Sequence, residues 1–404
     1  MLCECSVSSV KMLFFFILAF SSSHCTTLEE SVIAPTFEIT HQWSYINFTW
    51  ESSITYKEAI DSGDYIPENV AMAGIKFYRN RWYFALPKFR PGVPVTLAYI
   101  FADDSPINPL LTPYPDWETN TDPTCEGIKA IQSMEIDRSG VMWVLDGFRV
   151  TPATACPTKL VWYDLNTHRR IRSFTFPETI GLRRGGFLND IVVDDTGYAY
   201  ITDNSVIDPG LIVFSVRENR AWKFRDASMF PQLEAANFVV DDWPFRGLAP
   251  IDGIALTPRG SNPRVLLYCS LTGFSVYGIT TDVLKREDLL MSGDWRAYVT
   301  YLGDKQAQGD GMMMDNVGNL YYGLLPLYGV GRWNVFGGSP PEILYQNRST
   351  VIWPDSFAFD NQGYTYVLAN TILKFSDVNF RLVLNDEIKI RIFRFFTGAQ
   401  SYLF

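Results

Sequence analysis

Charged side chains are scarce in this chain of 404 residues, and positive charge is scarcer than negative charge. Asp, Glu, Lys and Arg make up 19% of the sequence, and the formal net charge is −10. No run of Lys or Arg stands out. Because nucleic-acid binding needs a basic face that neutralises phosphates, the sequence disfavours nucleic acid as a partner. The acidic balance is typical of a soluble protein and also suits a cationic ligand.

Histidine and the common catalytic motifs are also scarce. Only three histidines occur, and neither His41 nor His168 lies beside a nucleophile motif. The sequence contains no Gly-x-Ser-x-Gly elbow, no GxGxxG and no P-loop. A Ser-His-Asp hydrolase is therefore weakly supported.

Long apolar runs are missing except at the start of the chain. Lys11 precedes the apolar run 12–20, and three serines follow as a small-residue cleavage region. The run is too short to span a bilayer. We therefore predict a signal peptide at 1–25, a lead segment at 26–39, and a secreted, extracellular protein with no membrane span.

Cysteine is limited to six residues, of which three remain after removal of 1–25. In an oxidising compartment two of the three should pair. We favour Cys125 with Cys156 because both lie in loop-like sequence. Cys269 lies in an apolar run and is expected to be a buried free thiol. No cysteine spacing is typical of a metal site, so we predict no metal-binding cysteines.

Two N-glycosylation sequons fit an exported protein. They begin at Asn47 (Asn-Phe-Thr) and at Asn347 (Asn-Arg-Ser). We expect at least one of them to carry sugar.

What the chain does contain is a repeated hairpin. Four segments share an apolar stretch, an Asp-x-x-Gly turn and alternating large residues, with turns that begin at Asp137, Asp194, Asp315 and Asp360. Two degenerate copies lie at 74–84 and 254–268. In such a turn the Asp accepts hydrogen bonds from turn amides and the Gly takes a positive φ.

One such hairpin cannot bury both of its faces, so the copies must stack. Their turns lie roughly 45 to 63 residues apart, which suits four-stranded blades with variable loops. Six copies predict an all-β fold, a six-bladed β-propeller with a central ligand channel. We assign 40–383 to the propeller and leave 384–404 as a C-terminal tail without a defined place in the fold.

A polar residue lies eight positions before each of five turn glycines. These residues are Gln132, Asn189, Asp252, Asp310 and Asp355. Because innermost strands line the axis of a propeller, we expect these side chains to converge on one central site. Their oxygens suit either a hard cation such as calcium or the ammonium of an amine ligand assisted by aromatic faces. The structural alternative is that they tie the blades together.

Asn370 is a further candidate for the same site. It follows the last strand of the final repeat and should lie in a loop near the axis. The alternative is an ordinary turn asparagine.

Several patches along the chain resemble the yellow / major royal jelly family of insects. The most specific are 62–70 (SGDYIPENV), 86–100 (LPKFRPGVPVTLAYI), 114–117 (YPDW) and 377–381 (DVNFR). The resemblance spans nearly the whole mature chain and implies a secreted six-bladed propeller. In amine-binding relatives an Asn after the last-blade strand helps to hold the ligand in the axial channel, and Asn370 looks like its counterpart. Many relatives have Cys where this chain has Arg332.

The resemblance implies three kinds of role, since family members include dopachrome-converting enzymes of cuticle melanisation, salivary binders of biogenic amines and nutritive proteins. Our first hypothesis is catecholamine or melanin chemistry, by binding or converting a small indole or catechol such as dopachrome. If the protein is an enzyme, Asp310 or Asp355 would move the proton because histidine is scarce. The alternatives are a non-catalytic binder of biogenic amines or other small ligands, and a calcium-dependent lactonase-like hydrolase.

Overall fold

The computed structural model describes residues 35–149, 156–377 and 379–404. The predicted signal peptide at 1–25 lies outside the described residues, as does most of the lead segment at 26–39. Residues 35–404 form one compact unit.

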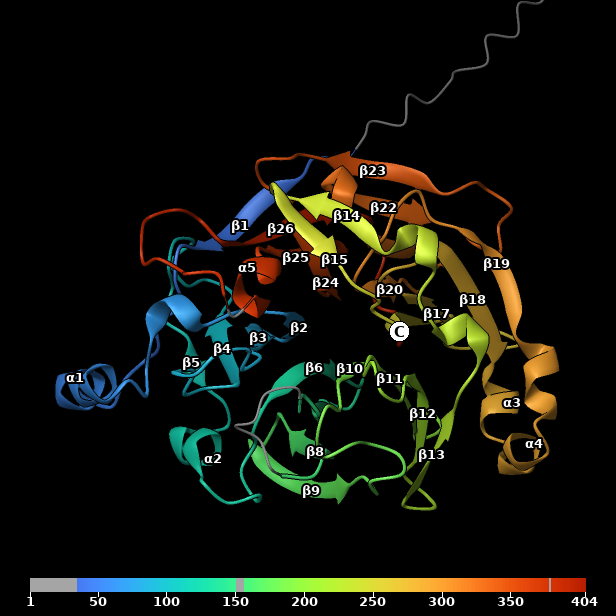
Figure 1. Cartoon of the computed structure of the whole chain (residues 1–404), viewed down its shortest axis with the longest axis horizontal. Helices are drawn as coiled ribbons and strands as arrows, with labels where there is room; N and C mark the ends of the chain where they lie inside the picture. The colour runs from blue at the N-terminus through green and yellow to red at the C-terminus, as the bar shows by residue number, and fades with distance from the viewer. Residues whose placement is uncertain (1–34, 150–155, 378) are drawn as a thin grey trace, which may run out of the picture. The chain divides into compact units, whose positions relative to one another are not determined.

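Six antiparallel four-stranded sheets are arranged as blades around an axis (Figure 1). Blade 1 contains β2 (Gly74–Tyr78), β3 (Arg81–Ala85), β4 (Leu97–Phe101) and β5 (Thr112–Pro113). Blade 2 contains β6 (Ile131–Ile136), β7 (Val141–Asp146), β8 (Lys159–Asp164) and β9 (Arg169–Thr175). Blade 3 contains β10 (Leu188–Val193), β11 (Tyr198–Asp203), β12 (Gly210–Ser215) and β13 (Arg220–Phe224).

The remaining blades follow in chain order. Blade 4 contains β16 (Ile251–Leu256), β17 (Val265–Ser270), β18 (Ser275–Thr280) and β19 (Thr300–Asp304). Blade 5 contains β20 (Met312–Met314), β21 (Leu320–Leu324), β22 (Gly329–Trp333) and β23 (Glu342–Gln346). Blade 6 contains β24 (Trp353–Phe359), β25 (Tyr364–Asn370), β26 (Ile390–Phe396) and β1 (Glu38–Trp43). The predicted six-bladed propeller is confirmed.

The other elements lie in the connections between and within blades. A separate hairpin consists of β14 (Asn237–Val240) and β15 (Trp243–Arg246). The helices are α1 (Ser53–Ser62), α2 (Trp117–Thr121), α3 (Thr281–Leu284), α4 (Glu287–Ser292) and α5 (Ile372–Ser376). Short 3-10 turns are η1 (Pro67–Asn69), η2 (Ala227–Met229), η3 (Leu233–Ala235), η4 (Asp294–Tyr298) and η5 (Leu325–Leu327).

The ring closes through the sixth blade, which joins both ends of the described chain. β1 pairs antiparallel with β26, from Glu38 opposite Arg394 to Trp43 opposite Ile390. The innermost strands contact one another in order, and β24 contacts β2. The propeller therefore continues past residue 383, where we expected it to end. The segment 384–404 supplies β26, which pairs with β25 on one side and with β1 on the other. Without β26, one edge of β25 would be left unpaired.

The repeated turn is built as its sequence predicts. Asp194 Oδ1 accepts hydrogen bonds from the amides of Thr196 and Tyr198, at 2.9 and 3.0 Å. Its Oδ2 accepts one from the hydroxyl of Tyr200, six residues further on, at 3.0 Å. Equivalent bonds are made by Asp137, Asp315 and Asp360. The turn glycines take φ between 83° and 93°, and they are Gly140, Gly197, Gly260, Gly318 and Gly363.

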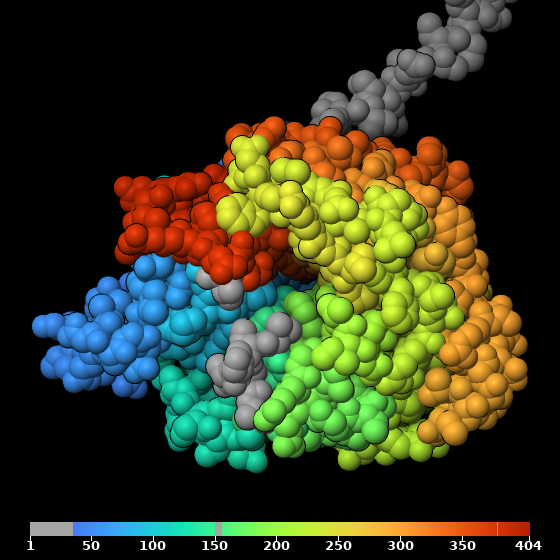
Figure 2. Space-filling model, viewed as in Figure 1, coloured from blue at the N-terminus to red at the C-terminus, as the bar shows by residue number. Residues whose placement is uncertain are grey.

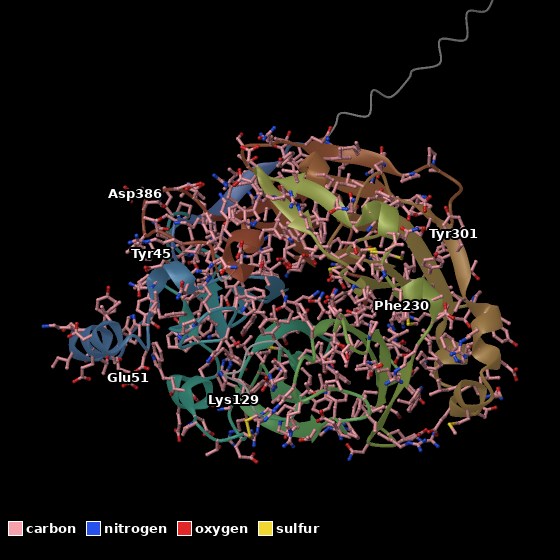
Figure 3. The ribbon with its side chains drawn as sticks, in the orientation of Figure 1. Tyr45, Glu51, Lys129, Phe230, Tyr301 and Asp386 are labelled. Atoms are coloured by element: carbon pink, nitrogen blue, oxygen red, sulfur yellow. A yellow bond between two sulfur atoms is a disulfide. The ribbon has the colours of Figure 1, made fainter. Side chains whose placement is uncertain are left out.

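The core lies between the blades, because each sheet packs against its neighbours on both faces. Every residue of β12 and of β16 is buried. Strands covered on both sides read as continuous apolar runs, and this explains the dense aliphatic sequence of both strands. Side chains fill the space between the sheets, while the exposed Tyr301 and Asp386 lie at the perimeter (Figure 3). None of the helices in the described part of the chain has the length and hydrophobicity of a membrane span.

Candidate functional site

The polar residues singled out in the sequence come together at the axis. Gln132, Asn189, Asp310 and Asp355 line one small cavity, together with Asp190 and the backbone of neighbouring strands. Asp252 is joined to them by a hydrogen bond from Asn189 Nδ2 to its Oδ1, at 2.8 Å. Each residue is at or near the start of an innermost strand, and for that reason one repeat position supplies one side chain from each of blades 2 to 6. A continuous channel along the axis stays a prediction.

Amide groups hold the buried carboxyls in place. Asn204 Nδ2 donates to Asp252 Oδ2 at 2.6 Å, so both oxygens of Asp252 accept from an amide. Asn370 Nδ2 donates to Asp355 Oδ2 at 2.6 Å and to the carbonyl oxygen of Met72 at 2.8 Å. Asn370 therefore ties blade 6 to blade 1. We call Asp252, Asp310 and Asp355 with their amide partners Asn189, Asn204 and Asn370 the axial cluster.

Indole and carboxyl groups also meet at this level. Trp353 Nε1 donates to Asp310 Oδ2 at 2.6 Å. Asp252 and Asp310 are also close enough for each carboxyl to shift the pKa of the other. The axial cluster therefore contains two interacting buried acids.

The electrostatics of the cluster favour protonated carboxyls. Burial, followed by repulsion from Asp310, raises the pKa of Asp252 well above its usual value. Burial and Asp310 do the same for the pKa of Asp355, although the bond from Asn370 opposes them. Burial also raises the pKa of Asp310, against the hydrogen bonds from Asp252 and Trp353 and the charge of Lys305. Desolvation disfavours the charged form of each acid, so the cluster retains protons that exposed aspartates lose.

Two buried oxygens in this region have no hydrogen-bond partner among the described residues. They are Gln132 Oε1 and Ser356 Oγ, and both residues line the axial cavity. The cavity has a volume of about 20 Å³. A space of this size accommodates about one water molecule, and it is far too small for an aromatic ring.

A much larger pocket lies beside the axial cluster. It has a volume of about 640 Å³ and is lined mainly by apolar side chains of loops. We call this the mouth pocket, and its lining includes Phe89, Phe148, Phe187, Asn204, Val206, Ile207, Phe245 and Leu248. On the face shown in Figure 2, the surface is hollowed beneath the β14–β15 hairpin. Pockets of several hundred cubic ångströms with apolar walls and few polar groups are typical of small-molecule sites.

Aromatic rings pack against one another around the mouth pocket, edge to face at Phe148 and stacked at Phe245. The ring centroid of Phe148 lies 5.0 Å from that of Phe89 and 4.9 Å from that of Phe187. Phe245 stacks on Phe238 at 4.8 Å. Asn204 lines the pocket and also donates to Asp252, so it links the mouth pocket to the axial cluster.

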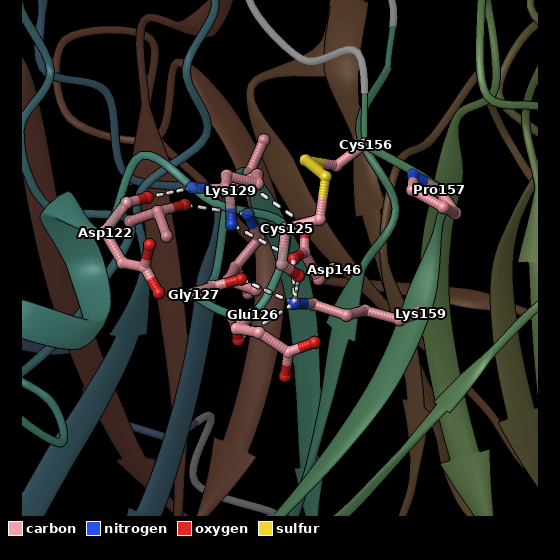
Figure 4. A network of polar contacts seen from close by, with 12 residues as sticks. Asp122, Cys125, Glu126, Gly127, Lys129, Asp146, Cys156, Pro157 and Lys159 are labelled. Atoms are coloured by element: carbon pink, nitrogen blue, oxygen red, sulfur yellow. Dashed lines mark hydrogen bonds and ion pairs between the residues drawn. A yellow bond between two sulfur atoms is a disulfide. The ribbon is translucent and has the colours of Figure 1, made fainter.

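A polar network holds the loops of blade 2 that carry part of this pocket (Figure 4). Cys125 and Cys156 form the predicted disulfide, with an S–S distance of 2.11 Å. Lys159 Nζ donates to the carbonyl oxygen of Cys125 at 2.6 Å and lies 3.8 Å from Asp146 Oδ2. Asp146 ends β7, and Phe148 follows it by two residues. Lys159 therefore holds the backbone at Cys125 close to the end of β7.

The sequence reasoning missed Asn204 and the phenylalanines. Asn204 lies ten residues after the turn residue Asp194, and Asn370 lies ten residues after Asp360. Asn370 was proposed from its place after the last strand of the final repeat and from the family resemblance. A comparison of the final repeat with the repeat that begins at Asp194 would also have pointed to Asn204. The phenylalanines lie in loops, where no repeat position distinguishes them from other aromatic residues.

Other sequence-predicted features have simple positions. Cys269 is a buried free thiol, as expected. Asn47 and Asn347 are each partly exposed, and glycosylation of either stays a prediction. Within residues 35–149, 156–377 and 379–404 there is no group of three or more His, Cys, Asp or Glu side chains placed to hold a metal ion.

The fold and the mouth pocket define a six-bladed propeller with a ligand-sized pocket beside its axis. The family of the major royal jelly protein matches residues 130–395, and the chain belongs to that family, the yellow / major royal jelly proteins. Protein yellow of Drosophila pseudoobscura pseudoobscura is 29% identical over 368 residues, covering 85% of this chain and 65% of the relative. The chain thus spans a little under two thirds of that relative's length. Protein yellow of Drosophila melanogaster is 29% identical over 368 residues, with coverages of 85% and 67%.

Among solved structures, a luciferin-regenerating enzyme has a TM-score of 0.51 and 10% identity, covering 91% of this chain and 97% of that chain. A protein of unknown function from Bacteroides thetaiotaomicron has a TM-score of 0.50 and 12% identity, with coverages of 90% and 76%. At these identities the similarity concerns the fold alone.

Proposed function

We propose that this yellow-family protein is secreted and binds a small aromatic molecule of the catechol or indole class in the mouth pocket, acting in catecholamine or melanin chemistry. The observation that carries the proposal is the position of Asn204, which lines an aromatic pocket and hydrogen-bonds a buried acid. The ring of the ligand packs between phenylalanine edges, and its polar end faces Asn204 and the axial cluster.

The charge at the axis supports a ligand that carries an amine. Burial, followed by repulsion from Asp310 and Asp190, raises the pKa of Asp252 and of Asp355, and few cations oppose it. An ammonium group placed beside these carboxyls lowers their pKa by Coulomb attraction. Ligand binding is therefore expected to release a proton from the cluster.

Conversion of dopachrome, a tautomerisation, requires one group to take a proton and another to give one. Asp310 and Asp355 remain our candidates for this role, since burial raises the pKa of each. The Asp252–Asp310 pair supplies both a proton and an acceptor in one place. Dopachrome is the substrate proposed for this chemistry.

Non-catalytic binding is the second candidate, and one feature of the geometry favours it. Asp310 and Asp355 line the cavity of about 20 Å³, whereas neither lines the mouth pocket. A ligand held only in the mouth pocket would contact Asn204 and the phenylalanines without touching a carboxyl. This arrangement suits a non-catalytic binder of small aromatic ligands, and an amine among them would need to reach the axial carboxyls with its ammonium group.

Secretion is supported by the disulfide between Cys125 and Cys156, because such bonds persist in oxidising compartments. It is also consistent with partly exposed sequons at Asn47 and Asn347.

The test measures binding and turnover on the same purified protein. Calorimetric titration with dopamine and serotonin should give saturable heat, and dopachrome decay should be faster than in buffer. Asp310→Asn should slow the decay, whereas the exposed control Asp288→Asn should not. Saturable heat without faster decay would identify a binder. Neither heat nor decay would overturn the proposal, and activity lost to a chelator would instead indicate the calcium-dependent hydrolase.

A further inference from the structure

Cys269 and Lys305 form a buried pair next to Asp252 and Asp310 of the axial cluster. Cys269 lies on β17 and is 0% exposed, and Lys305 follows β19 and is 3% exposed. Lys305 Nζ lies 3.1 Å from Cys269 Sγ. Within the described part of the chain, this sulfur is the hydrogen-bond acceptor of the amine. A thiol sulfur is a weak acceptor, so the pairing is unusual for a buried lysine, which ordinarily pairs with a carboxylate.

The surroundings of the pair hold the sulfur in a fixed position. The Cys269 thiol donates toward Met312 Sδ at 3.6 Å. A Cβ added at Gly253 would lie 3.5 Å from the sulfur, so the backbone of β16 packs close to it. Gly253 directly follows Asp252 in β16, and Asp310 senses the charge of Lys305. Both partners of the pair are thus fixed next to the carboxyls of the axial cluster.

We propose that Cys269 and Lys305 are a modification site, at which dioxygen joins the sulfur and the nitrogen through one oxygen atom in an N–O–S bridge. The S–H bond and one N–H bond of the neutral amine break, and an S–O and an N–O bond form. Sulfur and nitrogen each lose two electrons, and dioxygen accepts all four. One oxygen atom stays in the bridge, and the other leaves as water with the two hydrogen atoms.

Proximity is the reason that this pair reacts in preference to ordinary cysteine oxidation. The sulfur and nitrogen are already in contact, so closing the bridge needs little further ordering of either side chain. Among the described cysteines, Cys125 and Cys156 already pair with each other, so the Lys305 amine is the reactive group within reach of the Cys269 sulfur. Dioxygen is small enough to enter an interior that excludes larger oxidants.

The bridge changes the charge beside the axial cluster. Lys305 lowers the pKa of Asp310. Bridge formation converts an ammonium into an uncharged nitrogen, and the proton released from Lys305 can pass to a neighbouring carboxylate. The proposed modification therefore increases protonation of the cluster without altering any residue that lines the mouth pocket.

Peptide mapping by mass spectrometry of the full chain, without a reducing step, tests the site. After incubation in air, the peptides that contain residues 269 and 305 should appear as one linked species. Its mass should be their sum plus one oxygen atom less two hydrogen atoms. Dithiothreitol should separate the pair, and preparation under nitrogen with reductant should abolish it. Cys269→Ser is the matched control, because it removes the linked species and keeps the Cys125–Cys156 disulfide.

Recovery of Cys269 as a free thiol after air incubation would overturn the proposal. So would sulfinic or sulfonic acid at Cys269 with Lys305 unmodified, or a linked pair that lacks oxygen. The measurement is made on the wild-type protein, so the result does not depend on whether a Lys305 variant folds. It also involves no ligand, and a negative result leaves the proposed aromatic binding untouched.

Discussion

The axial cluster and the mouth pocket lie side by side but come from different parts of the chain. The acids of the cluster and Asn189 lie in or next to innermost strands at the same position of the repeat, and each carboxyl accepts at least one hydrogen bond from an asparagine amide or from the Trp353 indole. The mouth pocket is supplied mainly by connecting loops and by the β14–β15 hairpin. One region measures about 20 Å³ and the other about 640 Å³.

This difference separates structural from ligand-specific positions. A ring of repeats brings equivalent residues together whether or not they bind anything, and in this chain the equivalent residues bind one another. Loops are free to vary without disturbing the ladder of strands, and for that reason they carry most binding sites. We therefore expect substitutions in the axial cluster to change mainly the free energy of unfolding, and substitutions in the mouth pocket to change mainly the affinity for the ligand.

The largest expected effect is on stability, from Asp252→Leu. This change removes the acceptor of Asn189 Nδ2 and the shortest bond of Asn204 Nδ2, which keeps the carbonyl oxygens of Pro250 and Ile251 as acceptors. One orphaned buried amide costs about 1 to 3 kcal/mol and one lost hydrogen bond about 1 kcal/mol, so the free energy of unfolding should fall by about 2 to 4 kcal/mol. Urea denaturation followed by tryptophan fluorescence measures it. Asp252→Asn, which keeps one acceptor oxygen, should lose much less.

Equal losses from the two Asp252 variants would show that hydrogen bonding to this side chain does not hold the blades. In that case the distinction between a structural axis and a binding mouth would fail.

The repeat made most of the fold predictable from sequence. Asp137, Asp194, Asp315 and Asp360 mark turns whose Asp and Gly have local physical roles. Counting these four turns together with the two degenerate copies predicted six blades correctly. The convergence of Asp252, Asp310 and Asp355 followed from the same register. Positions fixed by strand periodicity are predictable because the ladder of hydrogen bonds places them.

The closing strand and the pocket were not predictable in this way. β26 lacks the Asp-x-x-Gly turn, and its partner β1 lies more than 340 residues away in the chain. Phe89, Phe148 and Phe187 meet only because three loops converge. Loop conformation depends on contacts between distant segments, and no periodic pattern in a single sequence predicts such contacts.

The pH dependence of stability should distinguish the buried acids from other carboxyls. Burial raises the pKa of Asp252 and Asp355 in the folded protein. The folded state then binds these protons more tightly than the unfolded state. The stabilisation is full below the unfolded pKa of about 3.9, and it is lost as pH rises through the raised values. Each pKa unit corresponds to about 1.4 kcal/mol.

The measurement compares the wild type with Asp252→Asn/Asp355→Asn at several pH values. Asp208 acts in the opposite direction, because its hydrogen bond from Arg225 lowers its pKa to about 2 and its contribution is lost on acidification. Since both proteins keep Asp208, only the difference between them is diagnostic. The double variant should gain relative stability as pH rises from 5 to 8. A constant difference would mean that the axial carboxyls titrate like exposed ones.

The smallest effect on stability, and the sharpest test of the mouth, comes from Phe187→Ala. Phe187 is only partly buried, so the free energy of unfolding should fall by about 1 kcal/mol. Loss of an aromatic wall should weaken dopamine or serotonin binding about tenfold, which corresponds to about 1.4 kcal/mol. Phe336→Ala, at a residue 55% exposed and away from the pocket lining, is the matched control and should change neither quantity. If Phe187→Ala bound as tightly as the wild type while Asp252→Asn did not, the ligand would belong at the axis, and the roles of the two regions would be reversed.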